Sequence, residues 1–125
     1  VRNSIGEPVR RDDWETVISE IVLHEDLQEA LNRIEDFSHI IVIYWMHKIG
    51  RSQRKTTKVH PQGNQSAPLV GVFASRSPAR PNPVGIRTVR LLERQANVLK
   101  VSGLDAINGT PVLDIKPYIH GLNSI

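Results

Sequence analysis

Apolar and polar positions alternate with the two-residue period of a β-strand over much of this chain. Residues 17–23 place four side chains on one face of an extended strand: Val17, Ser19, Ile21 and Leu23. Residues 40–46 form a continuous apolar run rich in β-branched and aromatic side chains, which is typical of a strand buried on both faces. Further strands are predicted at residues 69–74, 86–92, 98–102 and 112–115.

One segment has the period of a helix instead. Four apolar residues recur at positions i, i+3, i+4 and i+7 and would share one helix face: Leu27, Ala30, Leu31 and Ile34. An amphipathic helix is therefore predicted over residues 25–34. The dipeptide Asn108-Gly109 tolerates positive φ at both positions, so it predicts a tight turn before the strand at 112–115.

Together these elements predict a mainly β fold. Short strands with a single helix, and no helix between the later strands, favour a small closed or curled β-barrel of about six or seven strands. A chain of 125 residues fits one domain, spanning residues 1–125. Because the sequence begins at Val1, we expect that the first strand can extend upstream of it.

Charge is distributed unevenly along the chain. The formal net charge is +3, but residues 37–92 contain nine Lys and Arg side chains and no Asp or Glu. The remaining residues carry seven basic and 13 acidic side chains. Residues 37–92 thus carry a net charge of +9, and the residues on either side together carry −6. This asymmetry favours binding to a polyanion, of which nucleic acid is the commonest.

Two basic segments are predicted to be loops. Residues 48–67 contain almost no apolar side chains and are expected to be mobile without a ligand. Residues 75–83 hold three prolines, which lower the entropy cost of presenting Arg76, Arg80 and Asn82 in one arrangement. An arginine fork grips phosphate or carboxylate, although a stiff surface turn with solvated arginines would have the same composition.

Asp105 and Asp114 are two of the three acidic residues after position 36, so their neighbours are expected to be cations. Each carboxylate can neutralise an arginine of the basic loop as a structural ion pair. Alternatively, one of them binds a ribose hydroxyl or an ammonium group, or takes part in proton transfer. The residues alone leave both alternatives open.

Several classes of protein are excluded by what the sequence lacks. The absence of Cys excludes disulfides and thiolate metal sites and suits a cytoplasmic protein. His39, His47 and His60 lack metal-site spacing, so no metal is predicted. The longest apolar run covers seven residues, too few for a membrane span. No dinucleotide fingerprint, P-loop or nucleophile elbow is present.

Three motifs resemble those of the TsaA-like (TrmO) family. They are EDFSH at 35–39, GVFASRSP at 71–78 with RPNPVG at 80–85, and Asp105 with GTPVLDIKPY at 109–118. The resemblance implies a small β-barrel methyltransferase of non-Rossmann type, dependent on S-adenosylmethionine and acting as a homodimer. It also implies that the chain methylates the exocyclic nitrogen of threonylcarbamoyladenosine beside a tRNA anticodon.

Residue roles follow from the resemblance, position by position. It implies cofactor contacts from Arg11, Asp12, His47, Lys48, Arg76, Ile86, Ser102, Gly103, Leu104 and Asp105. It makes Arg80, Asn82 and Lys116 candidates for contacting tRNA or the threonylcarbamoyl group, and the basic loop adds Arg51, Arg54, Lys55 and Lys58. Asp114 and Tyr118 are candidates for orienting the acceptor nitrogen or accepting its proton. Asn108 stands where the family commonly has an acid.

Methyl transfer from a sulfonium depends mainly on in-line positioning, which agrees with the absence of a nucleophile motif. Two other functions remain compatible with the sequence. One is a module that binds S-adenosylmethionine without catalysis, and the other is a basic RNA-binding barrel.

Overall fold

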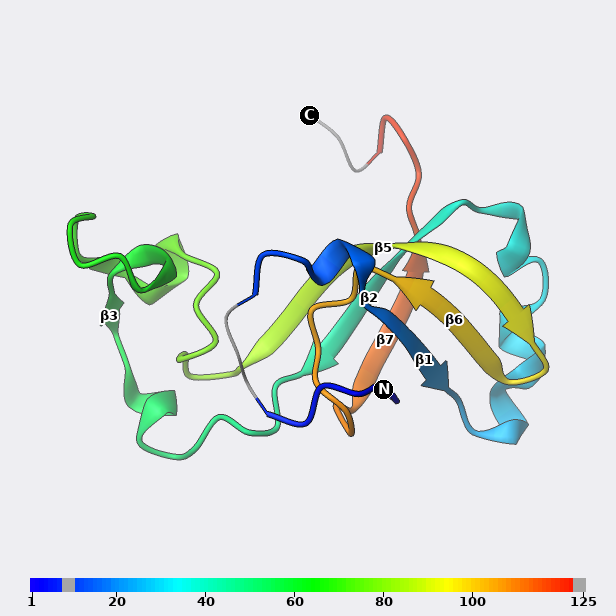
Figure 1. The fold of residues 1–125 in the computed structure, drawn as a ribbon, viewed down its shortest axis with the longest axis horizontal. Coiled ribbons are helices and arrows are strands. Elements are labelled where there is room, and N and C mark those ends of the chain that lie inside the picture. The colour runs from blue at the N-terminus through cyan, green and yellow to red at the C-terminus, as the bar shows by residue number, and fades with distance from the viewer. Residues whose placement is uncertain (8–10, 123–125) are drawn as a thin grey trace.

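The computed structural model describes residues 1–7 and 11–122, and its main element is a five-stranded antiparallel sheet (Figure 1). In spatial order the strands are β1 (Ile18–Val22), β6 (Val98–Ser102), β5 (Val84–Gln95), β2 (His39–Trp45) and β7 (Val112–Pro117). The prediction of a mainly β fold is confirmed. Among the described residues β1 and β7 are the two edges and do not pair with each other, so the structure does not confirm a closed barrel.

The two halves of β5 have different neighbours. β2 pairs with residues 84–90 of β5, whereas β6 pairs with residues 90–95 because Ser102, the last residue of β6, lies opposite Arg90. Among the described strands, residues 84–89 therefore have a paired neighbour on one side only. This half of β5 borders the site described below.

The core lies on the face of the sheet that carries Ile40, Val42 and Tyr44 of β2. The other fully buried side chains on this side include Ile21, Val89, Leu99, Val101 and Leu104. Each aliphatic side chain buried in this way contributes about 1.5–3 kcal/mol to stability. On the opposite face Ile43 and Trp45 are only half-buried, so the prediction that the strand at 40–46 is buried on both faces holds in part.

The helix predicted at residues 25–34 takes a different form. η2 (Glu25–Leu31) is a 3-10 helix, and Arg33, at φ 71°, separates it from a second short helix, η3 (Ile34–Asp36). A 3-10 helix has three residues per turn, so it cannot place the four predicted apolar residues on one face. Of these four residues, Leu31 is buried, whereas Leu27 is 47% exposed. The predicted helix end and apolar face are therefore wrong. A further 3-10 turn, η1 (Trp14–Thr16), precedes β1.

Residues 46–83, here called the arm, leave the sheet between β2 and β5 and extend away from it (Figure 1). The arm contains η4 (Gln53–Lys55), β3 (Lys58–Val59), η5 (Pro61–Gly63), β4 (Val70–Gly71) and η6 (Val72–Ala74). β3 and β4 form a separate two-stranded sheet. The strand predicted at 69–74 is confirmed only at Val70 and Gly71, because the Ser75 N–H and hydroxyl both donate to the Val72 carbonyl and close η6 instead.

Within the described ranges, no helix has the length and apolar composition that a membrane crossing requires.

Candidate functional site

A cavity of about 860 Å³ lies beside the first half of β5, within the roughly 300–1,000 Å³ usual for small-molecule sites. It brings together residues distant in the sequence. The predicted site residues that line it are Arg11, His47, Lys48, Arg76, Arg80, Ile86, Asp105 and Tyr118. The predicted residues that do not line it are Asp12, Arg51, Arg54, Lys55, Lys58, Asn82, Ser102, Gly103, Leu104, Asp114 and Lys116.

Asp105 is the one acidic side chain among the lining residues, which also include Arg11, Lys48, Arg76, Arg80 and Arg87. Its carboxylate accepts a hydrogen bond from the Tyr44 hydroxyl through Oδ1, and Arg87 Nη1 lies 3.8 Å from Oδ2. The cavity thus combines a single carboxylate with an excess of positive charge. It can take a ligand that has hydroxyl or ammonium donors at one point and anionic groups elsewhere.

Tyr44 is a residue that the sequence analysis did not select. Its ring is 4% exposed, and burial together with the adjacent Asp105 charge raises its pKa well above the ordinary value near 10. The hydroxyl therefore stays protonated and acts as the donor to Asp105. Gly85 lies opposite Tyr44 in the β2–β5 pair, and any Cβ there would come closer than 3.0 Å to the tyrosine ring.

The loop at 75–80 is held together by one of its own arginines. Arg80 Nη1 donates to the carbonyl oxygens of Ser75 at 3.0 Å and Ser77 at 3.2 Å, and its guanidinium lies 5.9 Å from the centre of the Phe73 ring. Arg76 is exposed and has no hydrogen bond or ion pair with the described part of the chain. Arg80 thus shapes the loop, while Arg76 is available to a ligand.

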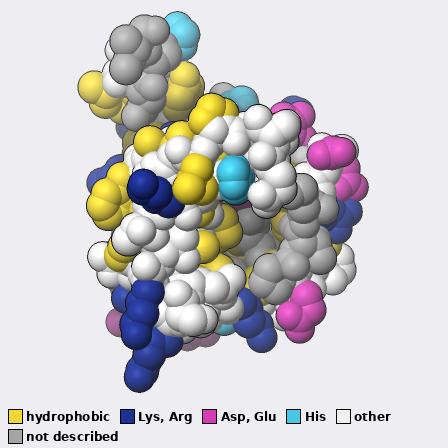
Figure 2. Space-filling model, turned by 90° about the vertical axis from the view of Figure 1, so that its left-hand side faces the viewer, with side chains coloured by type: hydrophobic (Ala, Val, Ile, Leu, Met, Phe, Trp, Pro, Cys, Tyr) yellow, Lys and Arg dark blue, Asp and Glu magenta, His cyan; other side chains and the backbone are white. Residues whose placement is uncertain are grey.

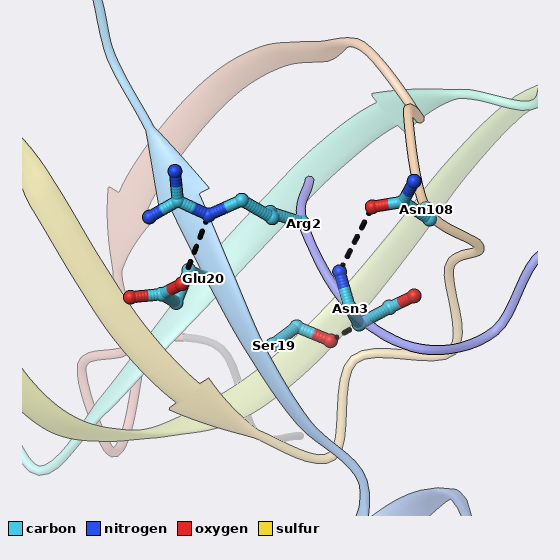
Figure 3. Close-up of polar contacts among 5 residues, drawn as sticks. All are labelled: Arg2, Asn3, Ser19, Glu20 and Asn108. Atoms are coloured by element: carbon cyan, nitrogen blue, oxygen red, sulfur yellow. Dashed lines mark hydrogen bonds and ion pairs between the residues drawn. The ribbon is translucent and has the colours of Figure 1, made fainter.

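N-terminal residues contact the segment that follows Asp105, and Figure 3 shows Asn3 between Ser19 and Asn108. Asn3 donates from Nδ2 to the Ser19 hydroxyl at 2.9 Å and to the Ala106 carbonyl at 2.8 Å. The Asn3 N–H donates to Asn108 Oδ1 at 3.0 Å. Because Ala106 lines the cavity beside Asp105, this network determines the shape of one cavity wall.

Residues 102–104 have structural partners. The Ser102 hydroxyl donates to the Glu15 carbonyl at 2.6 Å, and the Gly103 N–H donates to the Val17 carbonyl at 3.1 Å. Gly103 has φ 98°, a conformation that suits glycine, and the Leu104 side chain is fully buried. The Leu104 side chain is thus part of the core, and cofactor contacts from residues 102–104 stay a prediction.

Asp114 is exposed on β7 and is placed outside the cavity lining. The Ile115 N–H donates to its Oδ1 at 2.8 Å, and Lys116 Nζ lies 3.3 Å from its Oδ2. The backbone hydrogen bond and then Lys116 lower the pKa of Asp114. A lowered pKa makes this carboxylate a weaker base, whereas the second predicted catalytic residue, Tyr118, does line the cavity.

The cations of the arm divide into two kinds. Arg54 Nε donates to the Pro81 carbonyl at 2.8 Å, its Nη2 to Asn82 Oδ1 at 3.4 Å, and its guanidinium lies 5.3 Å from the centre of the Trp45 ring. All four of Arg51, Arg54, Lys55 and Lys58 are exposed, but only Arg54 makes contacts of this kind with the described residues. Figure 2 views the molecule from the end where the arm lies and shows basic and exposed hydrophobic side chains on that face.

The described residues hold no group of three or more His, Asp or Glu side chains placed to bind a metal ion.

Comparison with known proteins identifies a family. The family model described as the tRNA-methyltransferase O N-terminal domain matches residues 2–124. A protein of Archaeoglobus fulgidus named "Probable S-adenosyl-L-methionine-binding protein" is 45% identical over 106 residues, which are 85% of this chain and 28% of that protein. The mouse protein named tRNA (adenine(37)-N6)-methyltransferase is 41% identical over 97 residues, 78% of this chain and 22% of its own length.

Among solved structures, the crystal structure of TrmO from Pseudomonas aeruginosa superposes with a TM-score of 0.74 at 29% identity. The alignment covers 99% of this chain and 54% of that one. The chain thus spans between about a fifth and about half of the length of these relatives. On the match over residues 2–124, the chain belongs to the tRNA-methyltransferase O N-terminal domain family.

Proposed function

We propose that this chain is an S-adenosylmethionine-dependent methyltransferase domain that acts on tRNA and binds the methyl donor in the cavity beside β5. The observation that carries the proposal is the convergence of Arg76, Asp105 and Tyr118 on one cavity, although they are separated by up to 42 positions in the sequence. The names of the related proteins support the same pairing of cofactor and substrate.

The residues present fit this cofactor. Asp105 offers carboxylate oxygens to the ribose hydroxyls or the ammonium group, and the exposed Arg76 offers a fork to the carboxylate of the methionine part. When bound, S-adenosylmethionine supplies an electrophilic methyl group. The residues of the cavity would then align the methyl donor with the acceptor. In favourable cases such near-attack positioning lowers the activation barrier by about 7–11 kcal/mol.

We propose threonylcarbamoyladenosine beside the tRNA anticodon as the acceptor, with its exocyclic nitrogen as the methylated atom. The excess of cations around the cavity suits the threonyl carboxylate and nearby phosphates. The exposed arm cations Arg51, Lys55 and Lys58 would contact further phosphates. Tyr118 is the candidate for orienting the acceptor nitrogen, because it lines the cavity and Asp114 does not.

We also propose that the domain acts as a homodimer. Several apolar side chains that a monomer would leave in water support this: Leu69, Phe73, Val84, Ile86 and Leu113, each between 39% and 80% exposed. Ile86 also lines the cavity, so a partner subunit covering it would lie close to the bound cofactor.

The experiment that tests the function is transfer of labelled methyl groups from S-adenosylmethionine to tRNA that carries or lacks threonylcarbamoyl. We expect label only on the modified tRNA and its loss in Arg76→Ala. Label on both tRNAs would contradict the proposed acceptor. Cofactor binding without any transfer would instead support the second candidate, a binding module, which the name of the archaeal relative favours.

A further inference from the structure

We infer that Tyr44 is a positioning residue of the cavity, because its hydroxyl holds the Asp105 carboxylate in the orientation that receives a ligand's hydroxyl or ammonium donors. The inference deepens the proposed function and rests on it. It assigns a role to a side chain to which the motif resemblance gave none.

The first argument is the placement of Tyr44. The ring packs in the core with Val42 and Val89, while its hydroxyl reaches the cavity and donates to Asp105. The ring can lie there only because Gly85, its cross-strand partner, has no Cβ. A glycine within a strand costs stability through backbone entropy, and here it makes room for one specific side chain.

The second argument is the competition for the Asp105 carboxylate. Arg87 lies on β5 two residues after Gly85, on the same face, and approaches Oδ2 no closer than 3.8 Å. A free carboxylate beside an arginine would form a shorter, two-pronged pair that turns both of its oxygens toward the guanidinium. The bond from Tyr44 to Oδ1 opposes that movement. A carboxylate has about four acceptor sites, so the single hydrogen bond from Tyr44 leaves other sites open for a ligand.

The third argument is that Tyr44 remains a donor at every physiological pH. Burial of the side chain raises the pKa of this phenol, and an ionised phenol beside Asp105 would place two negative charges together. The hydrogen bond therefore has a fixed direction, from Tyr44 to Asp105, and does not depend on the state of the ligand. This constancy is what a positioning contact requires, and it distinguishes Tyr44 from a proton-transfer residue.

A merely structural tyrosine would give different behaviour on mutation. In that case Tyr44→Phe would lower stability without changing cofactor affinity, or its effect on affinity would not depend on residue 105. In a positioning role the effect of Tyr44→Phe exists only while the Asp105 carboxylate is present. A double-mutant cycle separates the two, because it measures the dependence of one substitution on the other.

The test is calorimetric titration of S-adenosylmethionine into four proteins: wild type, Tyr44→Phe, Asp105→Asn and the double variant. Tyr44→Phe keeps the ring that Gly85 accommodates, so we expect a folded protein. We expect its Kd to rise about tenfold, as for loss of a hydrogen bond to a charged group. In the Asp105→Asn background the same substitution should change Kd less than twofold. Asp36→Asn, which removes an exposed carboxylate paired with Arg33, is the matched control and should bind as wild type.

The outcomes distinguish this inference from the function on which it rests. If wild type binds the cofactor and the two substitutions add independently, the positioning role of Tyr44 is overturned and the proposed function stands. An unchanged Kd in Tyr44→Phe would overturn it in the same way. If wild type binds no S-adenosylmethionine, the proposed function fails and the role of Tyr44 fails with it.

Discussion

Tyr44 and Gly85 face each other across the β2–β5 pair, and the tyrosine ring occupies the space that a side chain at position 85 would need. This relationship links the sheet to the cavity. The ring contributes to the core, and its hydroxyl contacts Asp105 in the cavity. The same residue pair therefore affects stability and the candidate site, which gives the structure several measurable consequences.

The first prediction concerns Gly85. Gly85→Ala places a Cβ closer than 3.0 Å to the Tyr44 ring, so the ring or the strand must shift. We expect the free energy of unfolding to fall by about 1–3 kcal/mol, as in other overpacked cores. Urea denaturation measures this change. The control is Gly50→Ala, whose Cβ would meet only the end of the Gln53 side chain at 3.9 Å and should change stability by less than about 0.5 kcal/mol. Equal effects of the two substitutions would contradict the packing account.

A second prediction concerns alkaline pH. The pKa of Tyr44 is raised in the folded protein, so above pH 10 unfolding releases a proton from this phenol. The stability that the protonated phenol provides is complete below pH 10. It is then lost as the pH rises, by up to about 1.4 kcal/mol per pH unit. Stability measured from pH 8 to 11 should fall more steeply in wild type than in Tyr44→Phe. Parallel profiles would show that Tyr44 ionises equally well in both states.

The third prediction concerns the N-terminal network in Figure 3. Asn3→Ala removes the donor to the Ser19 hydroxyl, which is 1% exposed, and to the Ala106 carbonyl. Leaving such groups without a partner should cost about 1–3 kcal/mol of stability, measured by thermal or urea unfolding.

Asn108 provides the matched comparison for that network. Asn108→Asp keeps an oxygen that can accept from the Asn3 N–H, whereas Asn108→Ala removes it. We expect Asn108→Asp to be the milder of the two substitutions by about 1 kcal/mol. The reverse order would mean that the amide nitrogen of Asn108, and not its acceptor oxygen, matters at this position.

The fourth prediction concerns the attachment of the arm. Arg54, near the start of the arm, contacts Pro81 and Asn82 at the end of the arm and Trp45 of β2, whereas Arg51 has no such contact with the described residues. Arg54→Ala should therefore increase the rate of limited proteolysis within residues 50–70 severalfold, and Arg51→Ala should leave it unchanged. If both substitutions leave the cleavage rate unchanged, the Arg54 contacts do not hold the arm in place.

Much of the fold could be predicted from the alternation of apolar and polar side chains along the sequence. The strand predicted at 98–102 has those bounds in the structure, and the strand predicted at 17–23 is one residue shorter at each end. The pattern predicted β5 from Ile86 to Leu92, whereas the strand runs from Val84 to Gln95. Strand ends depend on pairing with distant segments, and β5 is extended by β2 at one end and β6 at the other.

The helix and the arm could not be predicted in the same way. Leu27 and Ala30 have α-helical spacing, but Arg33 adopts a positive φ that ends the regular path, and one sequence gives no sign of this. β3 has two residues, too few for a periodic signal. In both places local contacts within the fold determine the conformation.

The candidate site was predicted in part. Loop composition and charge pointed to Arg76 and Asp105, and the structure brings both to one cavity. Tyr44 was missed because in the sequence it is one aromatic residue in an apolar strand, and its partner Asp105 lies 61 positions away. The signal that could have found it is Gly85, a glycine directly before the strand predicted at 86–92. The homodimer and the cytoplasmic location stay predictions.

The most direct test of the central claim is the binding of S-adenosylmethionine to wild type, Asp105→Asn and Asp36→Asn, measured by calorimetry. We expect saturable binding by wild type and by Asp36→Asn, with affinity reduced by tenfold or more in Asp105→Asn. Absence of binding by wild type, or equal affinity in all three proteins, would contradict the assignment of the cavity as the methyl-donor site.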